Sequence, residues 1–187
     1  FVTVNLEGIS ASNFNLNFTN SKGKKVYTYS YELKDRKANS ANRNSFTSKD
    51  VMYLIMPGRF ANGDPSNDTM PGLTEKANRN LPDGRHGGDL RGIINQLDYL
   101  KNLGATTLWL TPANEDNEDK TTYHGYAQTD LYRLDPRYGT NQEYQELSRE
   151  LKNRDMKLVM DYVTNHWGSK HWLIQDLPTK DWIHWFD

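Results

Sequence analysis

The sequence lacks cysteine, long apolar runs and an excess of charge of either sign. Without cysteine among its 187 residues, disulfide bridges and thiolate metal sites are excluded. Mean hydropathy is −0.90, and no apolar stretch reaches membrane-spanning length. The 23 basic and 24 acidic residues give a formal net charge of −1. This balance argues against nucleic acid or an anionic membrane surface as the main partner.

The first 35 residues have the alternating pattern of β-strands. Apolar and polar residues take turns in "FVTVNL" (1–6), "NFNLNF" (13–18) and "KVYTYSYEL" (25–33). The polar segment "TNSKGKK" between the last two indicates a hairpin. A polar, unpatterned stretch follows, and we expect residues 36–49 to form a linker.

After this linker, strands alternate with helices. Short apolar runs at 51–57, 106–112 and 157–163 predict strands that are buried on both faces. Between them, helices are predicted over 90–104 and 141–155. The apolar face of the first helix would comprise Leu90, Ile93, Ile94, Leu97, Leu100 and Leu103.

Capping residues support both predicted helices. Asp89 is a plausible N-cap for the first helix, and Gly104 suits its carboxyl end. Thr140 and Glu143 stand three residues apart before the second helix, which is the spacing of a capping box.

The element order predicts an α/β fold with a parallel sheet and right-handed crossovers. Two architectures fit, a doubly wound sheet or strands 1–3 of a (β/α)8 TIM barrel. A dinucleotide-binding fingerprint needs G-x-G-x-x-G directly after a strand, and "HGGDLRG" has neither that spacing nor that position. The barrel is therefore favoured. Because a full barrel needs about 250 residues, we expect the chain to be part of a longer enzyme.

Polar side chains follow each predicted strand, and in a parallel barrel these strand ends share the face that carries the active site. After the first strand, "NGDPSND" concentrates oxygen groups of the kind that Ca²⁺ prefers. These are Asn62, Asp64, Asn67 and Asp68. An ordinary Asn/Asp turn explains the same composition, whereas an EF-hand is excluded because Asn67 occupies its glycine position. Asp89 adds a carboxylate, with the helix N-cap as its rival role.

The other two strands are followed by aromatic and imidazole side chains. "YHGY" places His124 and Tyr126 after the second strand. A lone loop histidine is usually a surface residue, but flanking tyrosines make this one a candidate for binding a neutral, hydroxyl-rich ligand. "DYVTNH" places Asp161 and His166 at the exit of the third strand. Asp161 could face the barrel mouth, or it could be a buried carboxylate paired with backbone or arginine.

Together these motifs resemble the α-amylase family, glycoside hydrolase family 13. "DYVTNH" resembles its signature D-x-V-x-N-H, and "YHGYAQTDLYRLDPRYGT" resembles the segment after its second strand. "MPGRFANGDPSND" with "HGGDL" resembles the calcium loop of its cyclomaltodextrinases, neopullulanases and cyclodextrin glucanotransferases. The similarity runs from about residue 50 to residue 187. One departure is Gly58, where related sequences often have Asp in P-D-R-F.

The resemblance implies a domain order. Residues 1–35 would be the end of an N-terminal β-sandwich, as in the neopullulanase and cyclomaltodextrinase branch, and 36–49 would be the linker. Residues 50–167 would form the first part of the catalytic barrel, and 168–187 would begin a protruding subdomain after strand 3.

The resemblance also implies an activity. The parent would be a retaining α-glucan hydrolase acting on α-1,4-glucosidic bonds of maltooligosaccharides, cyclodextrins or pullulan. The alternatives are a transglycosylase or isomerase of the same family, or a catalytically silent glucan-binding relative. The family's nucleophile and acid/base lie on later strands, so no catalytic residue is expected in this chain and the isolated fragment should be inactive.

Residue roles follow from the same resemblance. Tyr126 would stack under the sugar, His124 and His166 would bond its hydroxyls, and Asp161 would orient an arginine on the next strand. Asn165 ligates a second calcium in some members. The expected cofactor, calcium, would be held by Asn62, Asp64, Asn67, Asp68, Asp89 and the carbonyl of Gly87.

The expected partner is an α-glucan oligosaccharide, with neither nucleic acid nor membrane. Assembly into a homo-oligomer is a further expectation. Resemblance to bacterial starch-utilisation enzymes favours the periplasm, with the cytoplasm as the alternative.

Overall fold

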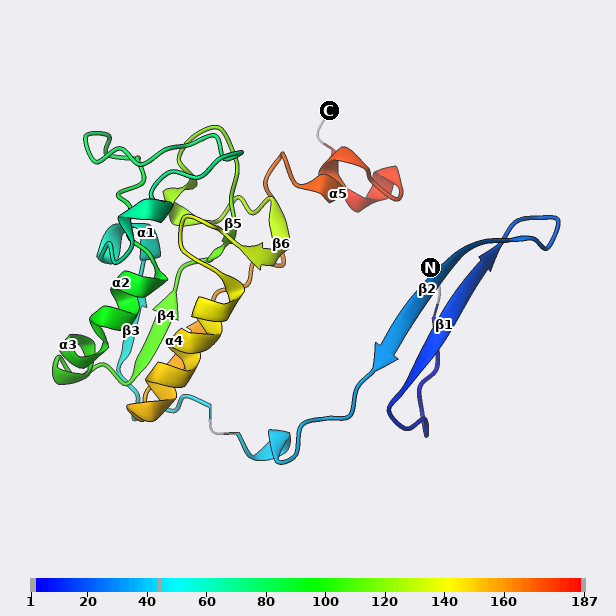
Figure 1. The fold of residues 1–187 in the computed structure, drawn as a ribbon, viewed down its shortest axis with the longest axis horizontal. Coiled ribbons are helices and arrows are strands. Elements are labelled where there is room, and N and C mark those ends of the chain that lie inside the picture. The colour runs from blue at the N-terminus through cyan, green and yellow to red at the C-terminus, as the bar shows by residue number, and fades with distance from the viewer. Residues whose placement is uncertain (1–2, 44, 186–187) are drawn as a thin grey trace. The chain divides into compact units, whose positions relative to one another are not determined.

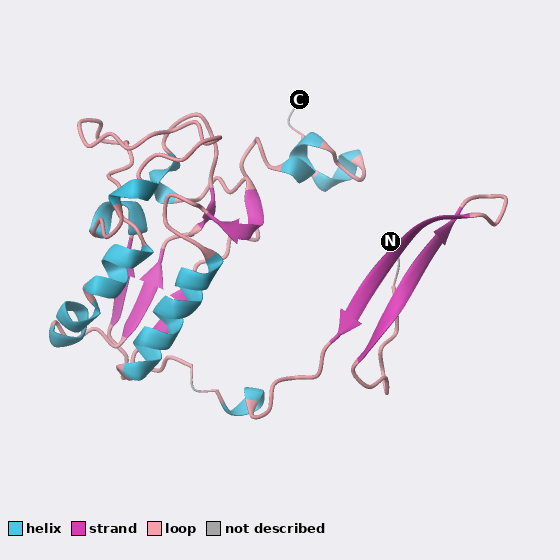
Figure 2. Ribbon diagram, viewed as in Figure 1, coloured by secondary structure: helices cyan, strands magenta, loops and turns pink. Residues whose placement is uncertain are grey.

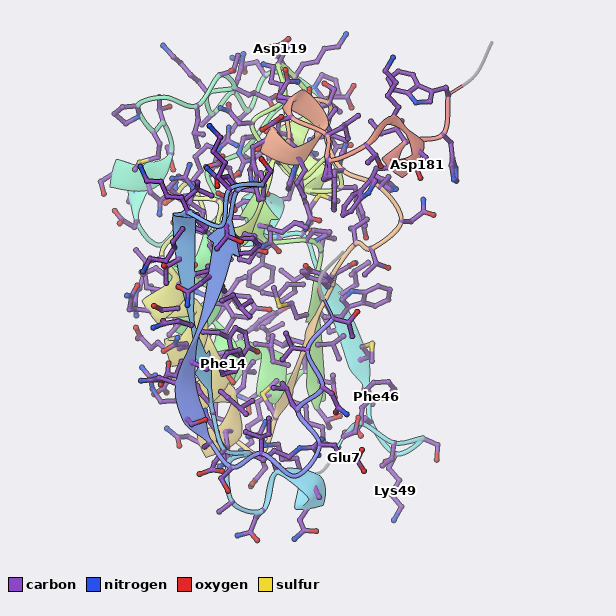
Figure 3. The ribbon with its side chains drawn as sticks, turned by 90° about the vertical axis from the view of Figure 1, so that its right-hand side faces the viewer. Glu7, Phe14, Phe46, Lys49, Asp119 and Asp181 are labelled. Carbon is purple, nitrogen blue, oxygen red and sulfur yellow. The ribbon has the colours of Figure 1, made fainter. Side chains whose placement is uncertain are left out.

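The computed structural model describes residues 3–43 and 45–185, which divide into two compact units, Phe1–Asn44 and Ser45–Asp187 (Figure 1). The first unit is a hairpin of two antiparallel strands, β1 (Ser12–Thr19) and β2 (Lys25–Leu33). Alternation puts aromatic side chains on one of its faces, where Phe14 (Figure 3) lies 5.2 Å from Tyr31, ring centre to ring centre. Both strands and the hairpin were predicted, and both are confirmed.

The predicted strand "FVTVNL" is wrong where the structure describes it. Residues 3–6 have no regular structure, while Phe1 and Val2 lie outside the described residues. A strand needs a partner for its backbone hydrogen bonds, and β1 pairs only with β2. After the hairpin, residues 34–43 are irregular apart from the 3-10 helix η1 (Ser40–Asn42).

The second unit contains a three-stranded parallel sheet in the order β3-β4-β7, formed by β3 (Met52–Ile55), β4 (Thr107–Leu110) and β7 (Lys157–Met160). The three strands are in register, with Ile55 beside Leu110 and Leu110 beside Met160. All three predicted strands are present, although each is shorter than its apolar run. The arrangement is an α/β unit with parallel strands, as predicted.

Three helices cover one face of this sheet (Figures 1 and 2). They are α2 (Leu90–Asn95), α3 (Leu97–Asn102) and α4 (Asn141–Asn153). The helix predicted over 90–104 is interrupted at Gln96, whose backbone is not helical. Both predicted start signals are confirmed, because Asp89 accepts a hydrogen bond from the N–H of Gly92 and α4 begins with a complete capping box.

The core lies between the helices and the sheet. Leu90, Ile93, Leu97 and Leu100 are fully buried there with Leu108, Leu110, Leu147 and Leu151. Leu103 was predicted on this face but is 55% exposed, and it lies just beyond α3, which ends at Asn102. The prediction that all three strands are buried on both faces is also wrong. β4 is enclosed, but the edge strand β3 leaves Leu54 53% exposed.

Long loops gather at the carboxyl ends of the three strands (Figure 1). The loop after β3 contains α1 (Pro57–Phe60) and η2 (Pro65–Asn67). The loop after β4 contains η3 (Thr122–His124) and a short antiparallel pair, β5 (Asn114–Glu115) with β6 (Asp130–Leu134), which was not predicted. After β7 come α5 (Trp172–Gln175) and η4 (Lys180–Trp182). Across residues 3–43 and 45–185, no helix has the length and apolar character needed to cross a membrane.

Candidate functional site

Tyr126 is the centre of a polar cluster at the carboxyl edge of the sheet. Its hydroxyl donates to Asp161 Oδ2 at 2.9 Å, and its backbone N–H donates to Nδ1 of His124 at 2.9 Å. Its carbonyl accepts from Nε2 of His166 at 3.1 Å. The structure therefore brings together all four residues that were expected to bind substrate, although they come from two loops 35 or more positions apart.

The hydrogen bonds fix which ring nitrogen of each histidine carries a proton. His166 must donate from Nε2, because a carbonyl only accepts, and its Nδ1 accepts from the side-chain amide of Asn165 at 3.2 Å. His124 accepts at Nδ1, so its own proton lies on Nε2. Partial burial lowers the pKa of His124, which favours the neutral ring. A neutral Nε2–H suits a sugar hydroxyl.

Asp161 lies one residue beyond β7, and its carboxylate is held from two sides. Besides the Tyr126 hydroxyl, the indole Nε1 of Trp109 on β4 donates to Oδ2 at 3.1 Å. Burial raises the pKa of Tyr126, and the neighbouring carboxylate adds to this, so the phenol stays protonated as the donor. Sequence reasoning missed Trp109. No local pattern marked this residue, because its neighbours on β4 are those of an ordinary buried strand.

The loop after β3 leaves buried polar atoms without partners. Oδ1 of Asn62 and Oδ1 of Asn67 are both buried and accept no hydrogen bond. Nδ2 of Asn62 donates to Asp68 Oδ1 at 2.7 Å, which orients the amide oxygen of Asn62 away from that carboxylate. Gly87 completes the arrangement with φ +82°, and a Cβ there would lie 2.5 Å from Asp68 Oδ1. A hard cation would satisfy such unpaired buried oxygens, and the glycine leaves room for its own carbonyl to approach the same place.

Two members of the expected calcium set are engaged in other contacts. Asp89 is fully buried and accepts from the N–H groups of Gly63, Asp64 and Gly92, so its rival role as the helix N-cap is real. Asp64 accepts from the hydroxyl and the N–H of Ser66, which lower its pKa. Within the described ranges, no three His, Asp or Glu side chains form a metal cluster. The fit to calcium therefore depends on Asn62, Asn67, Asp68 and Gly87.

A buried ion cluster, formed by Arg85, Asp116, Asp135 and Arg137, joins the loops after β3 and β4. Arg137 donates from Nε and Nη2 to Asp135 at 2.8 and 2.6 Å, and Arg85 Nη1 lies 3.4 Å from the same carboxylate. Arg137 also donates to the carbonyls of Glu75 and Asp116. Burial acts to raise the pKa of Asp135, but Arg137 and Arg85 outweigh it and hold the pKa below its usual range. The cluster fixes the loops that position Tyr126.

Asp116 behaves differently from its neighbour in this cluster. Its carboxylate accepts only from the backbone N–H groups of Glu118 and Ala127, at 3.3 and 3.2 Å. Burial raises its pKa to about 7, and the negative charge of Asp135 contributes in the same direction. Asp116 is therefore the carboxyl of this cluster that can hold a proton near neutral pH.

Comparison with known proteins identifies the family of this chain. A family model described as the catalytic domain of alpha amylase matches residues 54–187. The chain belongs to the α-amylase family. It is 43% identical over 134 residues to a beta/alpha-amylase of Paenibacillus polymyxa, covering 71% of this chain and 11% of that protein. It is 39% identical over 132 residues to neopullulanase 2 of Thermoactinomyces vulgaris, covering 70% of this chain and 22% of that protein.

Solved structures of this family agree. The crystal structure of an Anoxybacillus alpha-amylase superposes with a TM-score of 0.66 at 40% sequence identity, covering 74% of this chain and 29% of that one. The chain thus spans less than a third of the length of each of these relatives. What is shown is membership of a glycoside hydrolase family whose named members act on α-glucans.

Proposed function

We propose that this chain supplies one wall of a glucose-binding subsite in a retaining α-glucan hydrolase that acts on maltooligosaccharides, cyclodextrins or pullulan. The observation that carries the proposal is the convergence of Asp161, His124 and His166 on Tyr126 at the carboxyl edge of the parallel sheet. Names of relatives, beta/alpha-amylase and neopullulanase, support the same substrate class.

Each side chain has a role that its hydrogen bonds allow. Tyr126 is 37% exposed, and its ring would offer an aromatic face to a pyranose ring. His124 has Nε2–H free to bond a sugar hydroxyl. Asp161 Oδ2 is held by Trp109 and Tyr126, which suits the orienting role that the family resemblance implies for this carboxylate. Retaining hydrolysis needs two carboxyls about 5 Å apart across the bond, and we place that pair on later strands of the full-length protein.

We further propose that strands β3, β4 and β7 are the first three of a (β/α)8 barrel, that the hairpin β1–β2 ends a β-sandwich, and that calcium binds the loop after β3. Asn62, Asn67, Asp68 and the carbonyl of Gly87 would hold the ion, with Asp64 and Asp89 alongside. The ion would neutralise the acidic side chains and cross-link residues 62–68 to residues 87–89.

The test is hydrolysis by the full-length enzyme. Reducing ends should appear from maltoheptaose, a cyclodextrin or pullulan, and product analysis separates hydrolysis from transfer to a sugar acceptor. Asp161→Asn should lower kcat/KM on the order of 10²-fold, because a misplaced site geometry costs about that much. Asp155→Asn, on an exposed turn, is the control. If none of these glucans releases reducing sugar, the proposal fails, and turnover by the isolated 187 residues would contradict the placement of the catalytic pair.

A further inference from the structure

A small cavity beside α1 is lined by basic side chains. Its volume is about 110 Å³, and its wall includes Arg59, Arg79, His86 and the amide of Asn62. None of the residues that line it is acidic. It is distinct from the Tyr126 site, whose four residues do not line it. The cavity is therefore small and bordered by positive charge.

Arg59 is fixed in place but leaves a buried donor unpaired. Its Nη2 donates to the carbonyls of Pro82 and Gly84, the latter at 2.9 Å. Its guanidinium carbon lies 4.2 Å from the ring centre of Tyr123. Nε of Arg59 is buried, yet it has no hydrogen-bond partner. A buried, charged donor left unpaired is costly unless a ligand or water satisfies it.

His86 and Arg79 add to the same wall. Nε of Arg79 donates to the carbonyl of His86 at 2.9 Å, which ties the exposed Arg79 to the cavity. Nε2 of His86 is buried and unpaired. Among the ion pairs that the described residues form, neither Arg59 nor Arg79 has a carboxylate partner. Two guanidinium groups thus border one cavity without an ion-pair partner among the described residues, and a carboxylate that reaches the wall, that of Asp68, is bonded to Asn62.

Water could satisfy the unpaired nitrogens, but it would leave both positive charges uncompensated. An oxyanion satisfies the donors and the charge together, and the planar guanidinium fork matches its oxygens. The volume admits one small ion but not a nucleotide or an oligosaccharide. We propose that this cavity binds a small oxyanion of the phosphate or sulfate class. The anion would link α1 to the segment that carries Arg79 and His86.

The test titrates sodium sulfate at low millimolar concentration into the full-length protein, with chloride lowered to keep the ionic strength constant. Sulfate serves as the probe because phosphate precipitates calcium. We expect a saturable rise in melting temperature and a matching calorimetric binding isotherm. Arg79→Gln should weaken sulfate binding about tenfold to a hundredfold, the loss expected for a charge-assisted hydrogen bond. Arg149→Gln, on the exposed side of α4, should bind as the wild type does.

Arg79→Lys keeps the charge but not the fork, so it should bind sulfate with an affinity between those of wild type and Arg79→Gln. Arg79 is exposed and makes a single backbone contact, so both variants should fold. A wild type that shows no saturable response to sulfate overturns the proposal. So does an equal dissociation constant in wild type and Arg79→Gln. Neither result bears on glucan hydrolysis.

Discussion

Four residues of the loop after β3 and the Asp135–Arg137 pair of the loop after β4 differ in how their buried polar atoms are satisfied. In the loop after β3, Asn62, Asn67, Arg59 and His86 each leave a buried nitrogen or oxygen unpaired. In the loop after β4, Asp135 and Arg137 are more completely buried, yet they satisfy each other and the nearby carbonyls. The difference shows that burial alone does not mark a binding site. Gln128 Oε1 and Thr111 Oγ1 in the loop after β4 are unpaired too, so unpaired buried atoms indicate a ligand only where several of them lie together, whereas paired ones hold the structure together.

Breaking the ion cluster should give the largest effect. Arg137→Met leaves Asp135 buried beside Arg85 with its strongest partner gone, so we expect the free energy of unfolding to fall by about 3–5 kcal/mol. Chemical denaturation of the full-length protein measures this. Arg149→Met, on the exposed face of α4, should change stability by no more than about 0.5 kcal/mol. Equal effects of the two substitutions would show that the cluster is not structural.

Removing calcium should have the next largest effect and should act on the other loop. At calcium a hundredfold above its dissociation constant, chelation should lower the free energy of unfolding by about 2.7 kcal/mol. Asn67→Ala should abolish most of this difference while changing little in the chelated protein, because its buried Oδ1 has no protein partner. Asn153→Ala, at the exposed end of α4, is the control. A melting temperature that chelation leaves unchanged contradicts the calcium proposal.

The last prediction, whose effect is the smallest over any single pH unit, concerns Asp116. Its folded-state pKa of about 7 exceeds the ordinary value of 3.8, so between these values the folded chain keeps a proton that the unfolded chain releases. Stability should therefore fall as pH rises from about 4 to about 7, at most about 1.4 kcal/mol per pH unit from this group. Asp116→Asn should remove that slope, and Asp155→Asn should retain it. If Asp116→Asn and wild type show parallel stability profiles over this range, Asp116 titrates normally.

Patterns within one segment predicted the framework of the fold. The apolar runs located β3, β4 and β7, and the spacing of Thr140 and Glu143 located the start of α4. Local patterns failed where pairing with a distant segment decides whether a strand forms. "FVTVNL" alternates like a strand but has no strand to pair with in the described part of the chain, and the short pair β5–β6 depends on a loop folding back.

The residues of the candidate site could likewise be predicted from local patterns, but the contacts between them could not. His124, Tyr126, Asp161 and His166 could be proposed because polar groups follow strands, but their convergence on Tyr126 depends on the turns between them. Trp109 gave no sign of its role, since an apolar strand normally buries an indole. The ion cluster draws on residues more than 50 positions apart, and no local spacing encodes such a contact.

Tyr126 contacts its partners through both its backbone and its side chain. Both histidines bond to its main chain, whereas only Asp161 bonds to its side chain. Any residue that keeps the same backbone conformation would preserve both imidazole contacts. The aromatic platform proposed to lie under the sugar can therefore be exchanged in evolution or by engineering without re-aiming the histidines. In this proposal, stacking and hydrogen bonding are carried by separate parts of the site.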